Sequence, residues 1–290
     1  MRLIVDLAGQ ILRVMDGERL LREYPVSTAK LGAGEARGSF RTPRGRHVVR
    51  AKIGAGLPEG AVLKGRRWTG EIATAGLVAQ NPERDWILSR ILWLSGRQPG
   101  FNRLGACDTM ARYIYIHGTP DSEPMGVPLS HGCIRMRNAD VIELFDLIPA
   151  GSEVLIVPPD AENPATFPLV RIASPDAFPG LFADMLPIPG FADPMQWVVW
   201  DWQGTAVASM RLTAEGRLDG LVVLPAWRGQ GLETRLLQTA LDEAKKRGWF
   251  ELRAIADSDT ADFFSLAGFE LVGDRLAIGG VDHRMMRLFL

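Results

Sequence analysis

Residues able to do nucleophilic chemistry gather around one of the two cysteines in this 290-residue chain. Cys133 follows His131 by two residues and His117 by sixteen, within the runs His117-Gly-Thr119 and Ser130-His-Gly-Cys-Ile-Arg-Met136. A cysteine nucleophile needs a nearby base to take its proton, and the base needs a third group to orient it. The pattern therefore predicts a cysteine acyl-transfer site at Cys133, with either histidine available as the base.

The backbone around Cys133 must position these groups. In an extended segment, side chains two residues apart point to the same face, so His131 and Cys133 would lie together. Gly132 lets a substrate carbonyl approach closely, and the N–H groups of Gly132 and Cys133 could form the oxyanion hole. His117 ends an alternating strand expected over Tyr113–His117, which would place it on a rigid edge. The alternative is a buried structural cysteine beside core histidines.

The two runs resemble the catalytic signature of the L,D-transpeptidase (YkuD-like) family. The resemblance covers about residues 1–157, including the opening strand, the turn Thr42-Pro-Arg-Gly45 and the helix expected after the motif. It implies a mainly-β catalytic domain that acts on a peptidoglycan stem peptide. The cysteine of such a domain attacks the bond after the L-centre of a meso-diamino acid, an acyl-enzyme forms, and D-Ala leaves.

The same resemblance implies a role for each residue of the signature. His117 would be the base, oriented by the backbone carbonyl of Gly118, and His131 would lie beside the thiolate. Arg135 would support the site or a substrate carboxylate. The remaining candidates are Gly132 for catalysis and Ser130 and Thr119 for substrate binding. We expect no cofactor in this domain.

The acyl acceptor stays open at this stage, because an amine gives a crosslink or D-amino-acid exchange and water gives carboxypeptidase action. The opening stretch places Asp6 inside its first apolar run, so it lacks the uninterrupted apolar core of a secretory signal. We therefore expect a cytoplasmic L,D-carboxypeptidase that trims terminal D-Ala from the tetrapeptides of recycled muropeptides. The alternative is an exported L,D-transpeptidase.

A second motif, Arg228-Gly-Gln-Gly231, stands between an expected strand and a long expected helix. Glycines at such a turn let the backbone approach a phosphate, and a helix N-terminus offers free N–H groups. In this context the motif resembles the acetyl-CoA loop of GCN5-related N-acetyltransferases over residues 169–290. The resemblance implies an α+β acetyltransferase-like (GNAT) fold with acetyl-CoA as candidate cofactor, held by five residues: Val223, Arg228, Gly229, Gly231 and Leu232.

Two residues depart from that second pattern. Glu233 stands where the family has a small residue, and its carboxylate would repel the CoA pyrophosphate at the helix N-terminus. Phe264 stands where a tyrosine often protonates the leaving thiolate. The alternatives are a bifunctional enzyme, or an adaptor whose second half binds acetyl-CoA or a cell-wall fragment.

A run with four prolines, Pro158–Pro168, separates the two patterns and predicts a linker between domains 1–157 and 169–290. In the first domain we expect strands over Arg2–Val14, Leu20–Ser27, His47–Ile53, Trp86–Leu94, Tyr113–His117 and Glu153–Val157, and a helix over Asn138–Ile148 with Asn138 as its N-cap. In the second we expect strands over Trp197–Trp202, Thr205–Leu212, Leu218–Leu224 and Phe250–Ala256, and helices over Gly231–Arg247 and Asp259–Ala267.

Composition excludes several other classes. The isoelectric point is near 6.5 and no basic stripe alternates with aromatic residues, which argues against nucleic-acid binding. No apolar run is long enough to span a membrane, so we expect no membrane partner. Two cysteines and four histidines lack the spacing of a metal site, and Cys107 has no base near it in sequence. The sequence does not indicate an oligomeric state.

Overall fold

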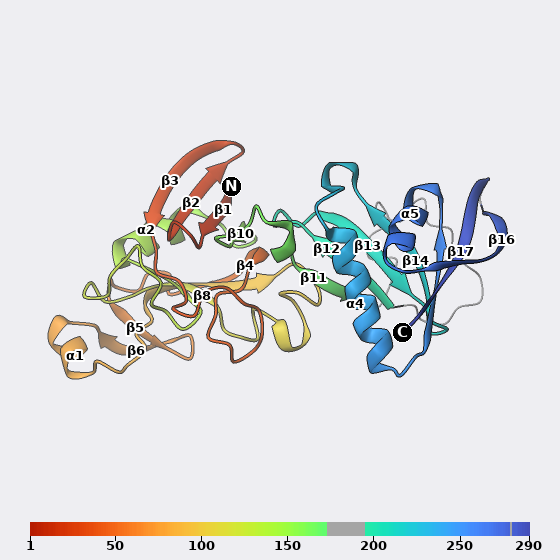
Figure 1. The fold of residues 1–290 in the computed structure, drawn as a ribbon. Helices are drawn as coiled ribbons and strands as arrows, with labels where there is room; N and C mark the ends of the chain where they lie inside the picture. Colours follow the sequence, from red (N-terminus) through yellow and green to blue (C-terminus); the bar gives the residue numbers. More distant parts are fainter. Residues whose placement is uncertain (173–194, 279) are drawn as a thin grey trace. The chain divides into compact units, whose positions relative to one another are not determined.

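The computed structural model describes residues 1–172, 195–278 and 280–290 of the chain (Figure 1). These residues form two compact units, Met1–Ala161 with Trp202–Gly204 and Glu162–Asp201 with Thr205–Leu290. The division after Ala161 falls inside the predicted linker. No helix in the described ranges is long and apolar enough to cross a membrane.

The first unit is built on one ten-stranded sheet. Its strands run in the order β3-β2-β1-β10-β4-β7-β5-β6, and two short strands continue from β7, with β8 pairing with β7 and β9 with β8. The elements are β1 (Arg2–Asp6), β2 (Ile11–Asp16), β3 (Arg19–Pro25), β4 (Gly45–Ile53), β5 (Ala61–Lys64), β6 (Arg67–Ile72), α1 (Ala75–Gln80), β7 (Leu88–Gly96), a 3₁₀ turn (Gly105–Cys107), β8 (Tyr115–Gly118), β9 (Ile134–Met136), α2 (Asn138–Leu147) and β10 (Glu153–Val157).

Alternation along the opening segment places Leu3, Val5 and Leu7 on the buried face, as the sequence pattern predicted. The prediction of a single strand over Arg2–Val14 was wrong. The Asp6 carboxylate accepts the N–H groups of Ala8 and Gly9, which turns the chain back and separates β1 from β2. The two strands then pair antiparallel, and Leu12 and Val14 of β2 join the same buried apolar cluster as the residues of α2.

The core of this unit lies between the sheet and α2. Val141, Leu144 and Phe145 of α2 pack on apolar residues of the central strands, including Ile116 of β8 and Ile134 of β9. These two isoleucines are fully buried, so β8 and β9 are held firmly on one face while their other face is left for the site. Burial of a side chain of this size contributes about 1.5–3 kcal/mol.

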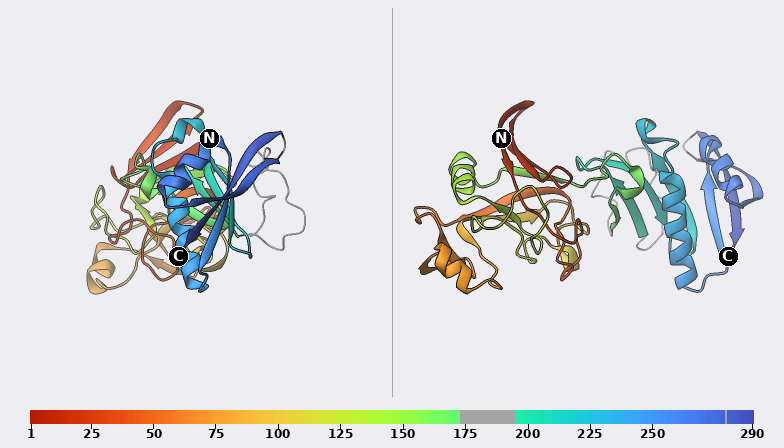
Figure 2. Two further views of the ribbon diagram at one scale, coloured as in Figure 1. Left: turned by 45° about the vertical axis from the view of Figure 1, so that its right-hand side comes forward. Right: turned by 60° about the vertical axis from the view of Figure 1, so that its left-hand side comes forward.

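The second unit is a seven-stranded sheet in the order β11-β12-β13-β14-β15-β17-β16, and Figure 2 shows β16 and β17 as a long hairpin. Its elements are a 3₁₀ turn (Pro164–Thr166), β11 (Leu169–Ile172), β12 (Met195–Trp200), β13 (Ala206–Leu212), β14 (Arg217–Val223), a 3₁₀ turn (Pro225–Trp227), α4 (Leu232–Lys246), β15 (Glu251–Ala256), α5 (Ser258–Leu266), β16 (Glu270–Ile278) and β17 (Val281–Phe289). The hairpin expected at Gln203-Gly204 joins β12 to β13.

The two helices of this unit follow their sequence signals. The apolar face predicted for α4 is buried through Leu232, Leu236 and Ala240, and the helix packs on β13 and β14. At α5 the Asp257 side chain accepts the N–H groups of Asp259 and Thr260, which fixes the helix start. The chain therefore has two compact units, one rich in β-strands and one of mixed α+β architecture.

Candidate active site

The Cys133 side chain is half-buried at the start of β9 and makes contacts with the backbone of the segment leading into β8. Its Sγ lies 3.4 Å from the Tyr115 N–H, which points at the sulfur, and 3.5 Å from the Tyr113 carbonyl, to which the thiol donates. Tyr113 adopts a left-handed backbone with φ 59°, which is unusual for a non-glycine residue. The predicted strand Tyr113–His117 begins only at Tyr115, and the strained residue before it aims its carbonyl at the thiol.

His117 lies on β8, where the sequence predicted a rigid strand position. The register of the parallel strands pairs Ile116 with Ile134 and His117 with Arg135. Because both isoleucines enter the core, His117, Arg135 and Cys133 belong to the opposite face. Two segments sixteen residues apart in sequence are thus brought side by side by one parallel strand pair.

The tautomer of His117 follows from the hydrogen bond that its ring makes with Gly118. Nδ1 lies 2.8 Å from the Gly118 carbonyl, which can only accept, so Nδ1 carries the proton. Nε2 is then unprotonated and available as a base. This is the arrangement that the resemblance implied for Gly118. Gly118 itself admits no side chain, because a Cβ would come within 2.4 Å of the Asn138 amide oxygen and 2.8 Å of the Leu88 carbonyl.

Both reactive groups are neutral in the resting site. Burial raises the pKa of the Cys133 thiol to about 12, against a smaller lowering effect of the Tyr115 N–H. Burial also lowers the pKa of His117 to about 4, although the bond to Gly118 acts in the other direction. Both shifts disfavour the thiolate–imidazolium pair, so the neutral pair is the resting state.

Gly132 is held in a conformation that glycine alone adopts readily, with φ +128°. An added Cβ would lie 3.2 Å from the Ile114 side chain and 3.3 Å from the Arg41 carbonyl. The Gly132 N–H donates to Ser130 Oγ, and the Gly132 carbonyl accepts the Thr42 hydroxyl. The expected oxyanion donor at Gly132 is therefore already engaged, whereas the Tyr115 N–H faces the sulfur directly.

Ser130 is a buried structural residue in this arrangement. Its hydroxyl donates to the Cys133 carbonyl while it accepts from Gly132, so it fixes the turn that presents the cysteine. Thr119 is also buried, and its carbonyl accepts the side-chain amide of Asn138. The structure thus brings Ser130 and Thr119 beside the site as supports, and neither of the two is exposed to a ligand.

Asn138 differs from its predicted role. It is the first residue of α2, and the N-cap position belongs to Arg137, which makes no capping bond. The Asn138 amide instead ties the helix to the chain behind His117, by donating to Thr119 and accepting from the Ser89 hydroxyl. Sequence reasoning missed this link, because a polar residue at a helix start is the usual capping signal.

Arg135 is already paired with acids of this chain. Its guanidinium lies 3.2 Å from the Asp85 carboxylate and 3.3 Å from that of Glu123, and only 9% of the side chain is exposed. A substrate carboxylate would have to displace one of these partners. The geometry therefore assigns Arg135 to support of the site, the first of the two roles considered from the sequence. A buried arginine requires acidic partners, but their positions in remote loops gave no sequence signal.

His131 is exposed, unlike His117. Its ring makes an edge contact with Phe40 at a centroid distance of 6.2 Å. Phe40 is also exposed and has a left-handed backbone, with φ 55°. Both rings are exposed, so His131 is accessible to a ligand.

Trp93, Tyr113 and Tyr115 form an aromatic wall beside Cys133, and the sequence did not predict that these three rings lie together. Trp93 of β7 stacks on Tyr113 at 6.1 Å and contacts Tyr115 edge-on at 6.0 Å. Cys133 packs against the same apolar cluster. The Arg66 guanidinium covers this wall, 4.5 Å from the centre of the Trp93 ring and 5.0 Å from that of Tyr113.

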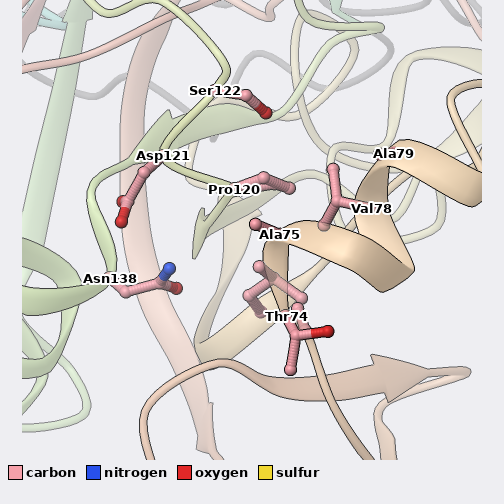
Figure 3. A pocket seen from close by; sticks show the side chains of 10 residues that line it. Thr74, Ala75, Val78, Ala79, Pro120, Asp121, Ser122 and Asn138 are labelled. Atoms are coloured by element: carbon pink, nitrogen blue, oxygen red, sulfur yellow. The ribbon is translucent and has the colours of Figure 1, made fainter.

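A pocket of about 260 Å³ lies between α1 and the loop after β8 (Figure 3). Small side chains form most of its walls, with Asp121, Ser122 and Asn138 as polar neighbours. Cys133 is not among the lining residues. No sequence pattern predicted α1, which is only six residues long, although Thr74 caps it.

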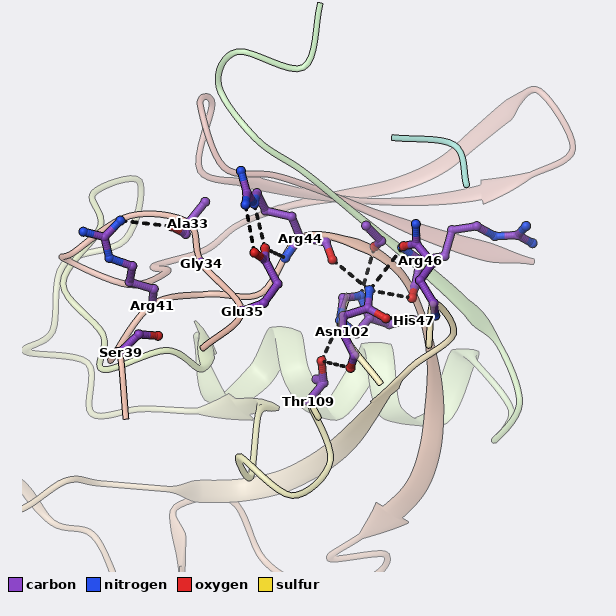
Figure 4. A network of polar contacts seen from close by, with 12 residues as sticks. Ala33, Gly34, Glu35, Ser39, Arg41, Arg44, Arg46, His47, Asn102 and Thr109 are labelled. Atoms are coloured by element: carbon purple, nitrogen blue, oxygen red, sulfur yellow. Dashed lines mark hydrogen bonds and ion pairs between the residues drawn. The ribbon is translucent and has the colours of Figure 1, made fainter. Parts of the chain in front are cut away.

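A buried polar network supports the loop that carries Thr42 (Figure 4). Glu35 binds Arg44 through both carboxylate oxygens, at 2.6 and 2.8 Å. His47 is fully enclosed, with Nδ1 at 2.9 Å from the Gly45 carbonyl and Nε2 at 3.0 Å from Thr109 Oγ1. Burial lowers the pKa of His47 to about 4, so this network holds a neutral imidazole.

The turn predicted at Arg228–Gly231 is present between β14 and α4, at the second candidate site. Gly229 and Gly231 have left-handed backbones, with φ 73° and 80°, and open space where a Cβ would stand. Gly231 is the N-cap of α4, so the predicted helix begins one residue later, at Leu232. Arg228 Nε reaches the Val223 carbonyl at 3.4 Å, which fixes its stem to the end of β14. The five candidate residues thus meet at one strand-to-helix junction.

Glu233 and Phe264, the two residues that depart from the acetyltransferase pattern, lie in different surroundings. Glu233 does lie in the first turn of α4. Phe264 is fully buried and packs edge-on against Phe263 and Phe269, so it is a core residue of the second unit.

Within the described residues, no cluster of histidine, cysteine and acidic side chains could hold a metal ion.

Two family models match this chain. The model described as the L,D-transpeptidase catalytic domain matches residues 1–156, and the one described as the acetyltransferase (GNAT) domain matches residues 188–290. The first covers more than half of the chain. The two matches do not overlap, and they coincide with the two sequence patterns.

Curated relatives agree with the first match. The YkuD protein of Bacillus licheniformis, named as an L,D-transpeptidase, is 28% identical over 158 residues, which are 54% of this chain and 66% of that protein. The YqjB protein of Bacillus subtilis, also named as an L,D-transpeptidase, is 46% identical over 63 residues, 22% of this chain and 34% of that protein. The chain therefore spans just under two thirds of one relative and about one third of the other.

Solved structures of both kinds are similar at low identity. An L,D-transpeptidase from Mycobacterium smegmatis shares 18% identity, covering 53% of this chain and 57% of its own, with a TM-score of 0.32. A GCN5-related N-acetyltransferase from Rhodopseudomonas palustris shares 20% identity, covering 43% of this chain and 96% of its own, with a TM-score of 0.35.

Proposed function

Since the chain belongs to the L,D-transpeptidase catalytic domain family, we propose that Cys133 cleaves the L,D bond of peptidoglycan stem peptides and transfers the acyl group to water. The substrate is a tetrapeptide or muropeptide, and the products are a tripeptide and D-Ala. The observation that carries this proposal is the placement of Cys133 and His117 on one face of adjacent strands, with His117 Nε2 left free as a base.

The reaction begins from the neutral pair. As Cys133 Sγ attacks the carbonyl carbon of the L-centre, its proton moves to His117 Nε2, so the thiolate forms only during attack. The Tyr115 N–H, which points at the sulfur, stabilises the negative charge that develops on Sγ during attack. Collapse breaks the C–N bond, and the imidazolium returns its proton to the departing amine of D-Ala, leaving a thioester on Cys133.

Water completes the cycle in this proposal. His117 takes a proton from the attacking water, the C–S bond breaks, and the sulfur recovers its proton as the tripeptide acid leaves. Water needs no second binding site for an acceptor chain, which is why we place hydrolysis first. The alternative is an amine acceptor, which gives L,D-transpeptidation or D-amino-acid exchange from the same thioester.

The proposal also includes the cytoplasmic location expected from the sequence, where soluble muropeptides are the available substrates. Cell fractionation followed by immunodetection of the untagged protein tests this part. Recovery with the cell envelope or outside the cell would contradict it and would favour the transpeptidase alternative.

The test of the reaction is mass spectrometry of the full chain incubated with a disaccharide-tetrapeptide, with and without D-methionine as a competing amine. We expect loss of one alanine from the tetrapeptide, and none with Cys133→Ala. His117→Gln should lower kcat/KM by about 10²–10⁴-fold. His131→Gln, which alters an exposed ring, is the matched control and should act less strongly.

Three results would change the proposal. Exchange of D-Ala for D-methionine without tripeptide would establish an amine-accepting enzyme. Tripeptide formation that survives Cys133→Ala would remove Cys133 from the reaction. Absence of any product, with a folded protein, would favour the adaptor alternative.

A second candidate function belongs to the acetyltransferase-like domain, and a specific feature favours it. The parallel strands β14 and β15 pair only at Arg217–Arg253 and Leu218–Ala254. Beyond Leu218, in the direction of the turn at Gly229 and Gly231, the backbones of the two strands are not hydrogen-bonded to each other. Unpaired backbone at that end, together with the N-terminus of the fifteen-residue α4, suits binding of acetyl-CoA.

Titration of tryptophan fluorescence with acetyl-CoA tests this second function. Saturable quenching that is lost in Arg228→Ala and strengthened in Glu233→Ala would support it, since removing the carboxylate removes repulsion of the pyrophosphate. No response at millimolar acetyl-CoA, in either the wild type or Glu233→Ala, would contradict it.

A further inference from the structure

Arg66 lies at the tip of the β5–β6 hairpin, in a region for which the sequence predicted no element. The register pairs Lys64 with Arg67, so Gly65 and Arg66 form a two-residue turn. Both have positive φ, 57° and 66°, as a type I′ turn requires. Glycine or asparagine is usual at the second position, and an arginine there carries backbone strain of about 1–3 kcal/mol. Strain of this kind points to a role for the side chain.

The Arg66 side chain is held in place by aromatic residues rather than by an acid. Its guanidinium covers the rings of Trp93 and Tyr113, and one of its N–H groups donates to the Tyr115 hydroxyl at 3.3 Å. Within the described residues no carboxylate pairs with it. A guanidinium has five N–H donors, so most of those on Arg66 remain available in a fixed orientation.

The residues beneath Arg66 are those that contact the nucleophile. The Tyr113 carbonyl and the Tyr115 N–H both lie against Cys133 Sγ, and Trp93 packs in the same cluster as Cys133. A cation held on this wall therefore stands beside the reacting atoms.

The guanidiniums of the two other arginines near the sulfur, Arg135 and Arg112, have partners of a different kind from those of Arg66. Arg135 is paired with two carboxylates. The Arg112 guanidinium donates to three backbone carbonyls, those of Gly34, Glu35 and Arg41. Among these three, only the Arg66 guanidinium has neither a carboxylate nor a backbone carbonyl as a partner within the described residues.

We propose that Arg66 binds a carboxylate of the stem peptide and so determines which peptides enter the Cys133 site. This inference rests on the proposed function. A tetrapeptide offers two carboxylates near the scissile bond, the terminal one of D-Ala and the one at the D-centre of the diamino acid. Both present the planar acceptor pair that a guanidinium recognises. A terminal carboxylate would restrict the enzyme to chain ends, and a D-centre carboxylate would select the diamino acid.

Binding in the Cys133→Ala background tests the proposal independently of turnover. Calorimetry compares three peptides: the diaminopimelate tetrapeptide acid, its C-terminal amide, and a lysine-containing tetrapeptide that lacks the D-centre carboxylate. We expect Arg66→Gln to weaken binding of the diaminopimelate tetrapeptide acid by about 10–100-fold. Arg67→Gln, which removes the neighbouring exposed charge, is the matched control and should leave affinity unchanged.

The peptide whose affinity is unchanged by Arg66→Gln identifies the carboxylate that Arg66 binds. If Arg66→Gln leaves the amide unaffected, the anchor is the terminal carboxylate, and if it leaves the lysine peptide unaffected, the anchor is at the D-centre. An equal loss on all three peptides, no loss, or no binding of any peptide would overturn the proposal. Turnover by the wild type is measured separately, so an inactive enzyme that still discriminates through Arg66 would contradict only the proposed function.

Discussion

His117 lies directly across from Arg135 on the parallel strands β8 and β9, and both side chains are buried. A guanidinium beside an imidazole disfavours the protonated ring. Burial is the largest cause of the lowered pKa of His117, Arg135 lowers it further, and Asp85 acts in the opposite direction. The strand pair therefore positions the base, and burial of the ring is the main reason that it stays unprotonated.

Replacing Arg135 with glutamine should raise the pKa of His117, because the lowering charge is removed and Asp85 is left unpaired. The acid limb of the pH profile of kcat/KM should then move upward from about pH 4. Arg137→Gln, a change in the next arginine along the chain, is the control. An acid limb that stays in place in a folded Arg135→Gln protein would contradict this role.

Alkylation of Cys133 by iodoacetamide should be slow at neutral pH, because only the thiolate reacts and burial holds the pKa of this thiol near 12. The rate should rise about tenfold for each pH unit up to that range. Peptide mapping in a Cys107→Ser background measures it. A carbapenem should acylate the same thiol at neutral pH, since His117 can take the proton during attack. Fast alkylation that reaches a plateau below pH 8 would contradict a neutral resting thiol.

Gly132→Ala should impair both stability and activity. Alanine at this position would have a positive φ, and its Cβ would make close contacts with Ile114 and Arg41. Such strain costs about 1–3 kcal/mol. Gly126→Ala is the matched control, because Gly126 has φ 80° but open space around it. Chemical denaturation and kcat/KM are compared for both variants. Equal effects of the two substitutions would show that the contacts around Gly132 do not matter.

Much of the first site could be predicted because its signals are local. His117 and Cys133 lie in short runs with a specific pattern, and alternation along β1 showed which face is buried. The supports of the site could not be predicted in this way. Asp85 and Glu123 reach Arg135 from separate loops, so only the folded chain brings them together.

Other features depend on backbone conformations that the sequence did not indicate. The β5–β6 hairpin lacks a strong alternating pattern, and its turn carries arginine where the usual signal is glycine or asparagine. Tyr113 reads as the first residue of a strand, but its left-handed backbone ends the pattern before β8. In the second domain the turn at Gly229 and Gly231 was predictable, whereas the short β14–β15 pairing depends on strand register.

Acid should destabilise the first domain through its neutral histidines. The pKa of His47 is about 4 in the fold and about 6.5 when unfolded, so the unfolded chain binds more protons between these values. Stability should therefore be unaffected by His47 above pH 6.5, and fall as pH drops toward 4, by up to about 3 kcal/mol. His117 acts in the same range.

Hydrogen exchange of β4 amides as a function of pH measures this effect. His47→Gln should reduce the loss of protection between pH 6.5 and 4, and His131→Gln, a change at an exposed ring, should not. An unchanged pH dependence in His47→Gln would contradict a buried neutral imidazole at this position.

In the proposed mechanism Cys133 carries the acyl group, and mass spectrometry of the digested protein tests this step. The full chain is mixed with a tetrapeptide, quenched in acid at short times and digested. We expect a tripeptide thioester on the peptide that contains Cys133, which forms before free tripeptide and is absent in Cys133→Ala. Tripeptide release with Cys133 unmodified at every time, or an adduct on Cys107, would contradict it.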